Sequence, residues 1–244
     1  MMKTSTNSAV ATVPAGVTSS SPGRSLAGML RETTREAHAR AEKHPLHASM
    51  VAGHVTKGQY VAWIGQMHHV WQAVDAALAA RCATDARFAS MVKPYHAHAD
   101  RIAADIEYLS PGRGCDAALP ATGRFVEMVR QAAASLGPEL IGIWYVLEGS
   151  TNGGRFIARS LSRALGIAGP DGLRSMDPHG EEQRERWRTW RADLDALSFT
   201  ETQCATIAHA ARWAFDAIYE LLEDLGSGAL VAKRSGPGIA PALY

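Results

Sequence analysis

The sequence is poor in cysteine, in long apolar runs and in any excess of charge. Its three cysteines, Cys82, Cys115 and Cys204, are odd in number and widely spaced, so neither a disulfide framework nor a zinc motif is indicated. The longest apolar run, residues 140–147, is far shorter than the roughly 20 residues that cross a bilayer. Because 25 basic side chains balance 24 acidic ones, charge favours neither nucleic acid nor an acidic tail. These absences exclude a membrane-spanning protein and leave an ordinary globular domain.

The two ends of the chain differ in composition from the middle. Residues 1–22 are rich in Ser, Thr, Ala and Val, with Lys3 as their only charged side chain, which predicts a disordered leader. Pro14 and several Ser and Thr residues interrupt the apolar positions, so a secretory signal is not supported and we expect a cytoplasmic protein. The predicted organisation is this leader, a helical domain over residues 23–226, and a flexible C-terminal tail over residues 227–244.

The middle of the chain has a helical pattern almost throughout. Ala, Leu, Arg and Glu dominate, and apolar residues return at intervals of three and four, which predicts an all-α, single-domain, multi-helix bundle. No alternating run indicates a strand. We expect helices over residues 25–43, 56–81, 85–109 with a bend at Pro94, 121–135, 139–165, 181–197 and 200–225.

The first predicted helix carries polar side chains along one face. Arg31, Thr34, His38 and Glu42 are spaced three and four apart, so they project from adjoining parts of the helix surface. The imidazole of His38 could bind a metal through Nε2 while the Glu42 carboxylate holds the Nδ1 proton. Arg31 could then reach an anionic group of the same ligand. The alternative is an ordinary half-buried histidine with an i, i+4 partner.

The helix over residues 139–165 contains a cluster of glycines. Gly149, Gly153 and Gly154 lie within six residues, and an interior glycine costs about 1 kcal/mol relative to alanine. Their missing Cβ atoms would let a flat, bulky ligand approach the backbone, and Trp144 could line the same pocket. The alternative is close helix packing or a kink.

Together these two segments resemble the heme oxygenase family, specifically the bacterial type associated with bacteriophytochromes. The resemblance rests on Leu-Arg-Glu-Thr-Thr-Arg-Glu-Ala-His-Ala-Arg-Ala-Glu at residues 30–42 and Glu-Gly-Ser-Thr-Asn-Gly-Gly at residues 148–154. It implies that His38 ligates heme iron, with Glu42 hydrogen-bonded behind it, and that residues 149–154 cover the other heme face. The implied activity uses O2 and external electrons, from a donor such as a ferredoxin or reductase, to convert heme to biliverdin, carbon monoxide and ferrous iron. The biliverdin could pass to a photoreceptor.

One position departs from the animal members of the family, which carry an aspartate where Ser150 stands. That aspartate orders the water that feeds protons to the bound oxygen. Serine can hydrogen-bond but cannot carry charge, so Thr151 or Asn152 could help to arrange the water here. The predicted catalytic segment is therefore Gly149, Ser150, Thr151, Asn152 and Gly153.

Heme propionates require cations at the pocket edge. Arg31 matches the family's basic position before the iron ligand, and the charged helix over residues 181–197 offers Arg191 and Arg186, although a charge run is more often a solvated face. The predicted heme contacts are Arg31, Thr34, His38, Glu42, Trp144, Gly149, Gly153, Gly154, Arg186 and Arg191.

Other histidines are expected to have structural roles. His96 and His98 lie two residues apart near Pro94, a spacing that divides them across a helix surface, so core or surface positions are favoured over metal binding. Two other functions stay open: a non-catalytic heme carrier, suggested by the missing aspartate, and a non-heme enzyme of the thiaminase-like type on the same architecture.

Overall fold

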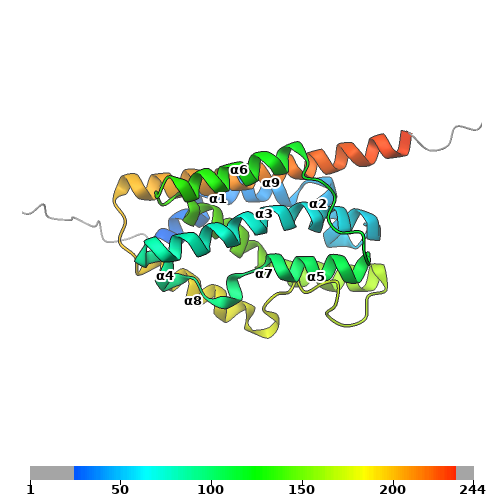
Figure 1. The fold of residues 1–244 in the computed structure, drawn as a ribbon, viewed down its shortest axis with the longest axis horizontal. Coiled ribbons are helices and arrows are strands. Elements are labelled where there is room, and N and C mark those ends of the chain that lie inside the picture. Colours follow the sequence, from blue (N-terminus) through cyan, green and yellow to red (C-terminus); the bar gives the residue numbers. More distant parts are fainter. Residues whose placement is uncertain (1–24, 235–244) are drawn as a thin grey trace, which may run out of the picture.

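A computed structural model describes the backbone of residues 25–234 and the side chains of residues 25–227. This part of the chain is helical and contains no strand (Figure 1). Its α-helices are α1 (Leu26–Glu42), α2 (Pro45–Ala52), α3 (Lys57–Thr84), α4 (Ala86–Met91), α5 (Ala99–Leu109), α6 (Pro120–Ala134), α7 (Glu139–Leu165), α8 (Gln183–Asp195) and α9 (Glu201–Arg234), with short 3-10 turns η1 (Pro94–His96) and η2 (Gly180–Glu182). The predicted all-α class is confirmed.

Local signals in the sequence set the helix ends. The Ser25 side chain accepts a hydrogen bond from the Gly28 backbone and begins α1, and Thr56 forms a capping box with Gln59 at the start of α3. Gly166, with a φ of 66°, ends α7 in the left-handed region. The predicted bounds of α7 are those observed.

Two parts of the structure differ from the prediction. The helix α2 was not predicted; Pro45 begins it, where a missing N–H costs nothing, and left-handed Gly53 ends it. The segment 85–109 is not one bent helix but α4, η1 and α5, because Asp85 caps a new helix and Pro94 interrupts the next.

The last helix is longer than predicted. It ends at Arg234 rather than near residue 225, so residues 227–234 of the predicted tail are helical. Residues 235–244 and the predicted leader lie outside the described residues.

The helix α7 forms the centre of the bundle. It packs against α9 most extensively and also contacts α2, α6 and α8, while α3 packs on α5 and α6. Its N-terminal half is buried on every side, with Leu140, Ile143 and Leu147 fully covered. At Gly142 a Cβ atom would lie 2.2 Å from the Ile207 carbonyl oxygen, so this glycine is what lets α7 and α9 approach closely. In the described residues, no helix has the length and apolar character needed to cross a bilayer.

Candidate functional site

His38 lies on an uncovered strip of α1. About half of its side chain is exposed (53%), as is that of Glu42 (56%), and the imidazole edge contacts the ring of Phe215 on α9. The nearest approach to the carboxylate joins Nε2 to Oε1 at 3.5 Å, whereas the sequence predicted that Nδ1 would face Glu42. If this half-exposed ring turned, Nδ1–H would donate a hydrogen bond to the carboxylate, and Nε2 would be free to bind a ligand.

The glycine segment gives α7 its exposed strip. Ser150 and Gly153 are exposed, while the preceding two turns are buried. Among the described residues, a Cβ atom placed on Gly153 would meet no other segment within 4 Å, whereas one on Gly149 would lie 3.3 Å from the Trp187 ring. The open surface is therefore at Gly153 and Ser150, and Trp187 of α8 covers Gly149.

Tyr145 connects this strip to α1 and α8. Burial raises the pKa of its phenol, while the nearby charges of Arg191 and Arg31 and the neighbouring Thr34 side chain act in the opposite direction. Thr34 lies one turn before His38, and Tyr145 lies one turn before Gly149. The exposed strips of α1 and α7 therefore begin next to each other, at Thr34 and Tyr145. The guanidinium groups of Arg31 and Arg191 lie beside this point.

Arg191 has an incomplete set of partners at this junction. Its Nε is buried without a hydrogen-bond partner among the described residues, and its guanidinium lies 5.7 Å from the Trp187 ring centre. A buried N–H without an acceptor is costly. An anionic ligand group at the junction would supply that acceptor.

Two predicted heme contacts have other roles. A Cβ atom on Gly154 would lie 2.0 Å from the Met176 carbonyl oxygen, so Gly154 makes room for the loop 166–180 and not for a ligand. Trp144 is fully buried, with its ring 5.1 Å from Trp190 and 5.0 Å from His96. It is a core side chain and cannot line an open pocket without rearrangement.

The polar residues after Ser150 hold α8 in place. Gln183 donates to the Thr151 hydroxyl at 2.8 Å and to the Asn152 side-chain oxygen at 3.3 Å. Asn152 also donates to the Gly149 carbonyl. Both residues are occupied by these bonds, which leaves Ser150 as the exposed hydroxyl on the strip. The Ser150 hydroxyl donates to the Leu147 carbonyl at 2.6 Å, and its oxygen can still accept.

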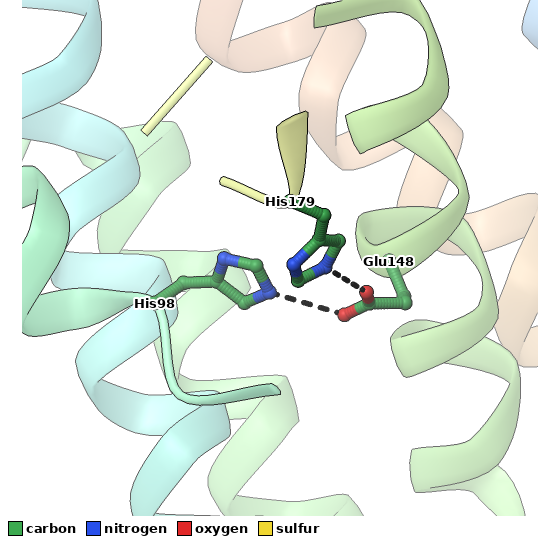
Figure 2. A group of neighbouring side chains, drawn as sticks. All are labelled: His98, Glu148 and His179. Atoms are coloured by element: carbon green, nitrogen blue, oxygen red, sulfur yellow. Dashed lines mark hydrogen bonds and ion pairs between the residues drawn. The ribbon is translucent and has the colours of Figure 1, made fainter. Parts of the chain in front are cut away.

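A buried cluster of His98, Glu148 and His179 lies beside the glycine segment (Figure 2). Each imidazole points its Nε2 at a different oxygen of the Glu148 carboxylate, and both distances are 3.1 Å. Burial raises the pKa of Glu148, but hydrogen bonds from His179 and His98 outweigh it and lower the pKa to about 2. His98 precedes α5 and His179 precedes η2. Their bonds to Glu148 therefore connect these two segments to α7, at the residue directly before Gly149.

The surroundings of this cluster oppose a metal ion, although its ligand atoms all lie within 4.8 Å of one another. Arg186 Nη1 lies 3.0 Å from Nδ1 of His179, and a guanidinium can only donate. Nδ1 must therefore accept, which places the ring proton on Nε2, where it is donated to Glu148. A metal-bound histidine usually needs an acceptor at its second nitrogen. The cluster is a hydrogen-bond network, and Arg186, predicted to contact a propionate, instead completes it.

Comparison with known proteins finds relatives over most of the chain. Residues 24–224 match the sequence model of the family described as heme oxygenase, which covers most of the chain. The chain belongs to the heme oxygenase family. A heme oxygenase of Takifugu rubripes is 24% identical over 220 residues, covering 88% of this chain and 79% of the relative.

Solved heme oxygenase structures share the fold. Heme oxygenase-2 from Synechocystis sp. PCC 6803, in complex with heme and NO, aligns with a TM-score of 0.78 at 22% identity, covering 86% of this chain and 88% of that one. The heme oxygenase of Leptospira interrogans aligns with a TM-score of 0.76 at 21% identity, covering 82% and 98%. The predicted family, enzyme class and fold are confirmed.

Tyr145 and the buried cluster were not predicted from the sequence. His98 and His96 are core residues, as one of the expected alternatives held, but the partnership of His98 with Glu148 and His179 was not foreseen. The one available signal was Glu148, a carboxylate directly after the apolar run 140–147. A buried carboxylate requires partners, but their separation along the chain hides which residues supply them.

Proposed function

We propose that this protein cleaves heme oxidatively to biliverdin, carbon monoxide and ferrous iron, using O2 and electrons from an external donor. One observation carries the proposal: the half-exposed His38–Glu42 pair of α1 and the open surface at Gly153 of α7 each follow, within about two turns, the neighbouring residues Thr34 and Tyr145. A histidine on one helix and open backbone on another suit a ligand that is bound on both faces.

The described residues fit a heme. His38 would ligate the iron through Nε2, Arg31 and Arg191 would bind the propionates, and Gly153 would lie against the opposite face. The unpartnered Nε of Arg191 and the empty space at Gly153 support this assignment. Bound heme supplies both the iron that activates oxygen and the macrocycle that is opened.

The protein side chains would orient the reactants. Glu42 would hold the Nδ1 proton of His38 and so fix the ring orientation and tautomer. Gly153 would leave the space that a side chain would otherwise fill. The Ser150 hydroxyl would bind water and pass protons through hydrogen bonds, but it cannot hold the charge of an aspartate.

We place the protein in the bacteriophytochrome-associated subtype, with a ferredoxin or reductase as electron donor and the cytoplasm as its location. Support for the subtype is Ser150, while Asn152 stands where that subtype is expected to carry an apolar residue. A photoreceptor that takes up biliverdin would be the consumer of the product.

Hemin titration followed by reductant tests the reaction. We expect one hemin to bind per chain, and the heme absorption to be replaced by a biliverdin band when oxygen and a reductant are added. A heme spectrum that persists under these conditions would indicate a carrier. No change of the hemin spectrum on adding protein would indicate a non-heme function.

Replacement of His38 tests the proposed iron ligand. His38→Ala should weaken hemin binding and change the spin state of the ferric heme, because its nitrogen ligand is removed. The control is His54→Ala, since His54 is also exposed but lies between α2 and α3. An unaltered ferric spectrum in His38→Ala would exclude His38 as the ligand.

Replacement of Gly153 tests the open face. Gly153→Leu places a large side chain where a Cβ atom meets no other segment of the described chain within 4 Å, so the variant should fold but lose turnover. Full turnover in a folded Gly153→Leu protein would show that heme does not lie against this surface.

A further inference from the structure

A pocket lies on the side of α7 away from the glycine strip. It has a volume of about 640 Å³ and is formed by the C-terminal half of α7, the start of α5 and the loop 166–180. Gly153 and Arg155 are two residues apart, which separates them by roughly 200° around the helix. The pocket includes Arg155 but none of the residues of the glycine strip, so it is separate from the proposed heme site.

Five arginines from three segments line this pocket. Arg155, Arg159 and Arg163 follow one another at intervals of four on α7, Arg101 comes from α5, and Arg174 comes from the loop. Like charges spaced i, i+4 on a helix repel one another. The negative end of the α7 dipole stabilises cations only in the last turn, which accounts for Arg163 but not for Arg155 and Arg159.

Carboxylates in the neighbourhood neutralise only part of this charge. Arg155 contacts Glu181 at 2.8 Å, with Asp177 at 3.6 Å, and Arg174 contacts Asp171 at 2.7 Å. Among the residues whose side chains are described, no carboxylate forms an ion pair with the other three arginines of the pocket, Arg101, Arg159 and Arg163.

Arg101 is held in place by the protein itself. Its Nη1 donates to the backbone carbonyls of Tyr95 and Ala97 at 3.1 Å and 2.7 Å, and burial lowers the pKa of its guanidinium. Its position is therefore fixed in advance of binding, which reduces the entropy that a ligand must overcome. Arg101 also feels the charges of Glu148 and Asp75, whereas Arg159 and Arg163 are exposed and can turn towards a ligand.

The pocket also has an apolar part. Ala158, Pro170 and Leu173 line it together with the arginines. Guanidinium groups bind phosphate oxygens in pairs, and apolar side chains bind a carbon framework. We propose that this pocket binds a small organic phosphate, with the dianionic group at Arg159, Arg163 and Arg101 and the organic part against Leu173.

Calorimetric titration of the heme-loaded full-length protein with phenyl phosphate tests the proposal. Inorganic phosphate tests the phosphate group of the ligand alone, and benzyl alcohol tests its organic part alone. We expect saturable one-to-one binding of phenyl phosphate, weaker binding of inorganic phosphate and no binding of the alcohol. The same titration without heme should give the same affinity, because the two sites are separate.

Variants at the exposed arginines identify the site. The double replacement Arg159→Ala with Arg163→Ala should weaken phenyl phosphate binding about tenfold or more, since two charged hydrogen-bond donors are lost. Replacing both by lysine should retain part of the affinity, because charge remains but paired donation does not. Arg113→Ala is the control, because Arg113 is exposed, paired with Asp116 and outside the pocket.

Several results would overturn the proposal. Absence of saturable phenyl phosphate binding would remove the site, and undiminished binding by the double alanine variant would place it elsewhere. Loss of phenyl phosphate binding on loading with hemin would mean that the pocket takes the tetrapyrrole. None of these readouts depends on heme cleavage, so a failure here is distinct from a failure of the proposed reaction.

Discussion

Gly153 and Gly154 are neighbours in α7, but alanine at the two positions should change stability in opposite directions. A Cβ atom on Gly153 meets open space, so Gly153→Ala only restores helix propensity and should stabilise the heme-free protein by up to about 1 kcal/mol. A Cβ atom on Gly154 would lie 2.0 Å from the Met176 carbonyl oxygen. Backbone must then move by on the order of 1 Å, since carbon contacts need more than 3 Å.

The expected cost of that movement exceeds the gain in helix propensity. Overpacking of a well-filled site costs typically 1–3 kcal/mol, so Gly154→Ala should be destabilised by up to about 2 kcal/mol net. For a domain of this size, each kcal/mol shifts Tm by about 2–4 °C. Thermal unfolding of the two heme-free variants, followed by circular dichroism, should therefore give Tm values on either side of the wild-type value.

The comparison refutes the packing argument if the two variants behave alike. Equal stabilisation would mean that the loop 166–180 does not press on Gly154 and that this glycine is free to face a ligand. A loss of stability in Gly153→Ala would mean that its surroundings are filled. Either result would remove the structural distinction between the two glycines.

Two further predictions concern the buried cluster and the propionate site. Glu148→Gln should destabilise the fold by about 2–3 kcal/mol, because an amide donor would face a ring N–H. The pKa of Glu148 in the wild-type protein is lowered from 4.5 to about 2. The difference in unfolding free energy between wild type and Glu148→Gln, measured in urea, should therefore be full above about pH 4.5 and shrink as the pH falls towards 2. A difference independent of pH would show that Glu148 is not ionised. Arg191→Ala should weaken hemin binding about five- to tenfold, with exposed Arg188→Ala on the same helix as control; equal effects would exclude a specific role for Arg191.

The part of the site that lies on single helices was predictable from the sequence. His38 and Glu42 are one turn apart, and helix geometry alone puts them on one face. The same holds for Ser150 and Gly153 on α7. Conformational preferences act within a few residues, so caps and periodicity also gave most of the helix bounds, including those of α7.

Only the tertiary structure shows what each glycine faces. Gly149, Gly153 and Gly154 look alike in the sequence, but they meet the Trp187 ring, open space and the Met176 carbonyl, respectively. What a missing Cβ makes room for depends on the neighbouring segment, and no local pattern encodes that segment.

The chain by itself determined the helices, the polar face around His38 and the glycine segment, because these depend on spacing along one element. Packing decided which surfaces meet. Tyr145 contacts Thr34, and Glu148 binds histidines 50 and 31 residues away, because burial of α7 forces its polar groups to take partners from whichever segments cover it. Those contacts follow from the whole fold, and they are what distinguishes a polar helix face from a site.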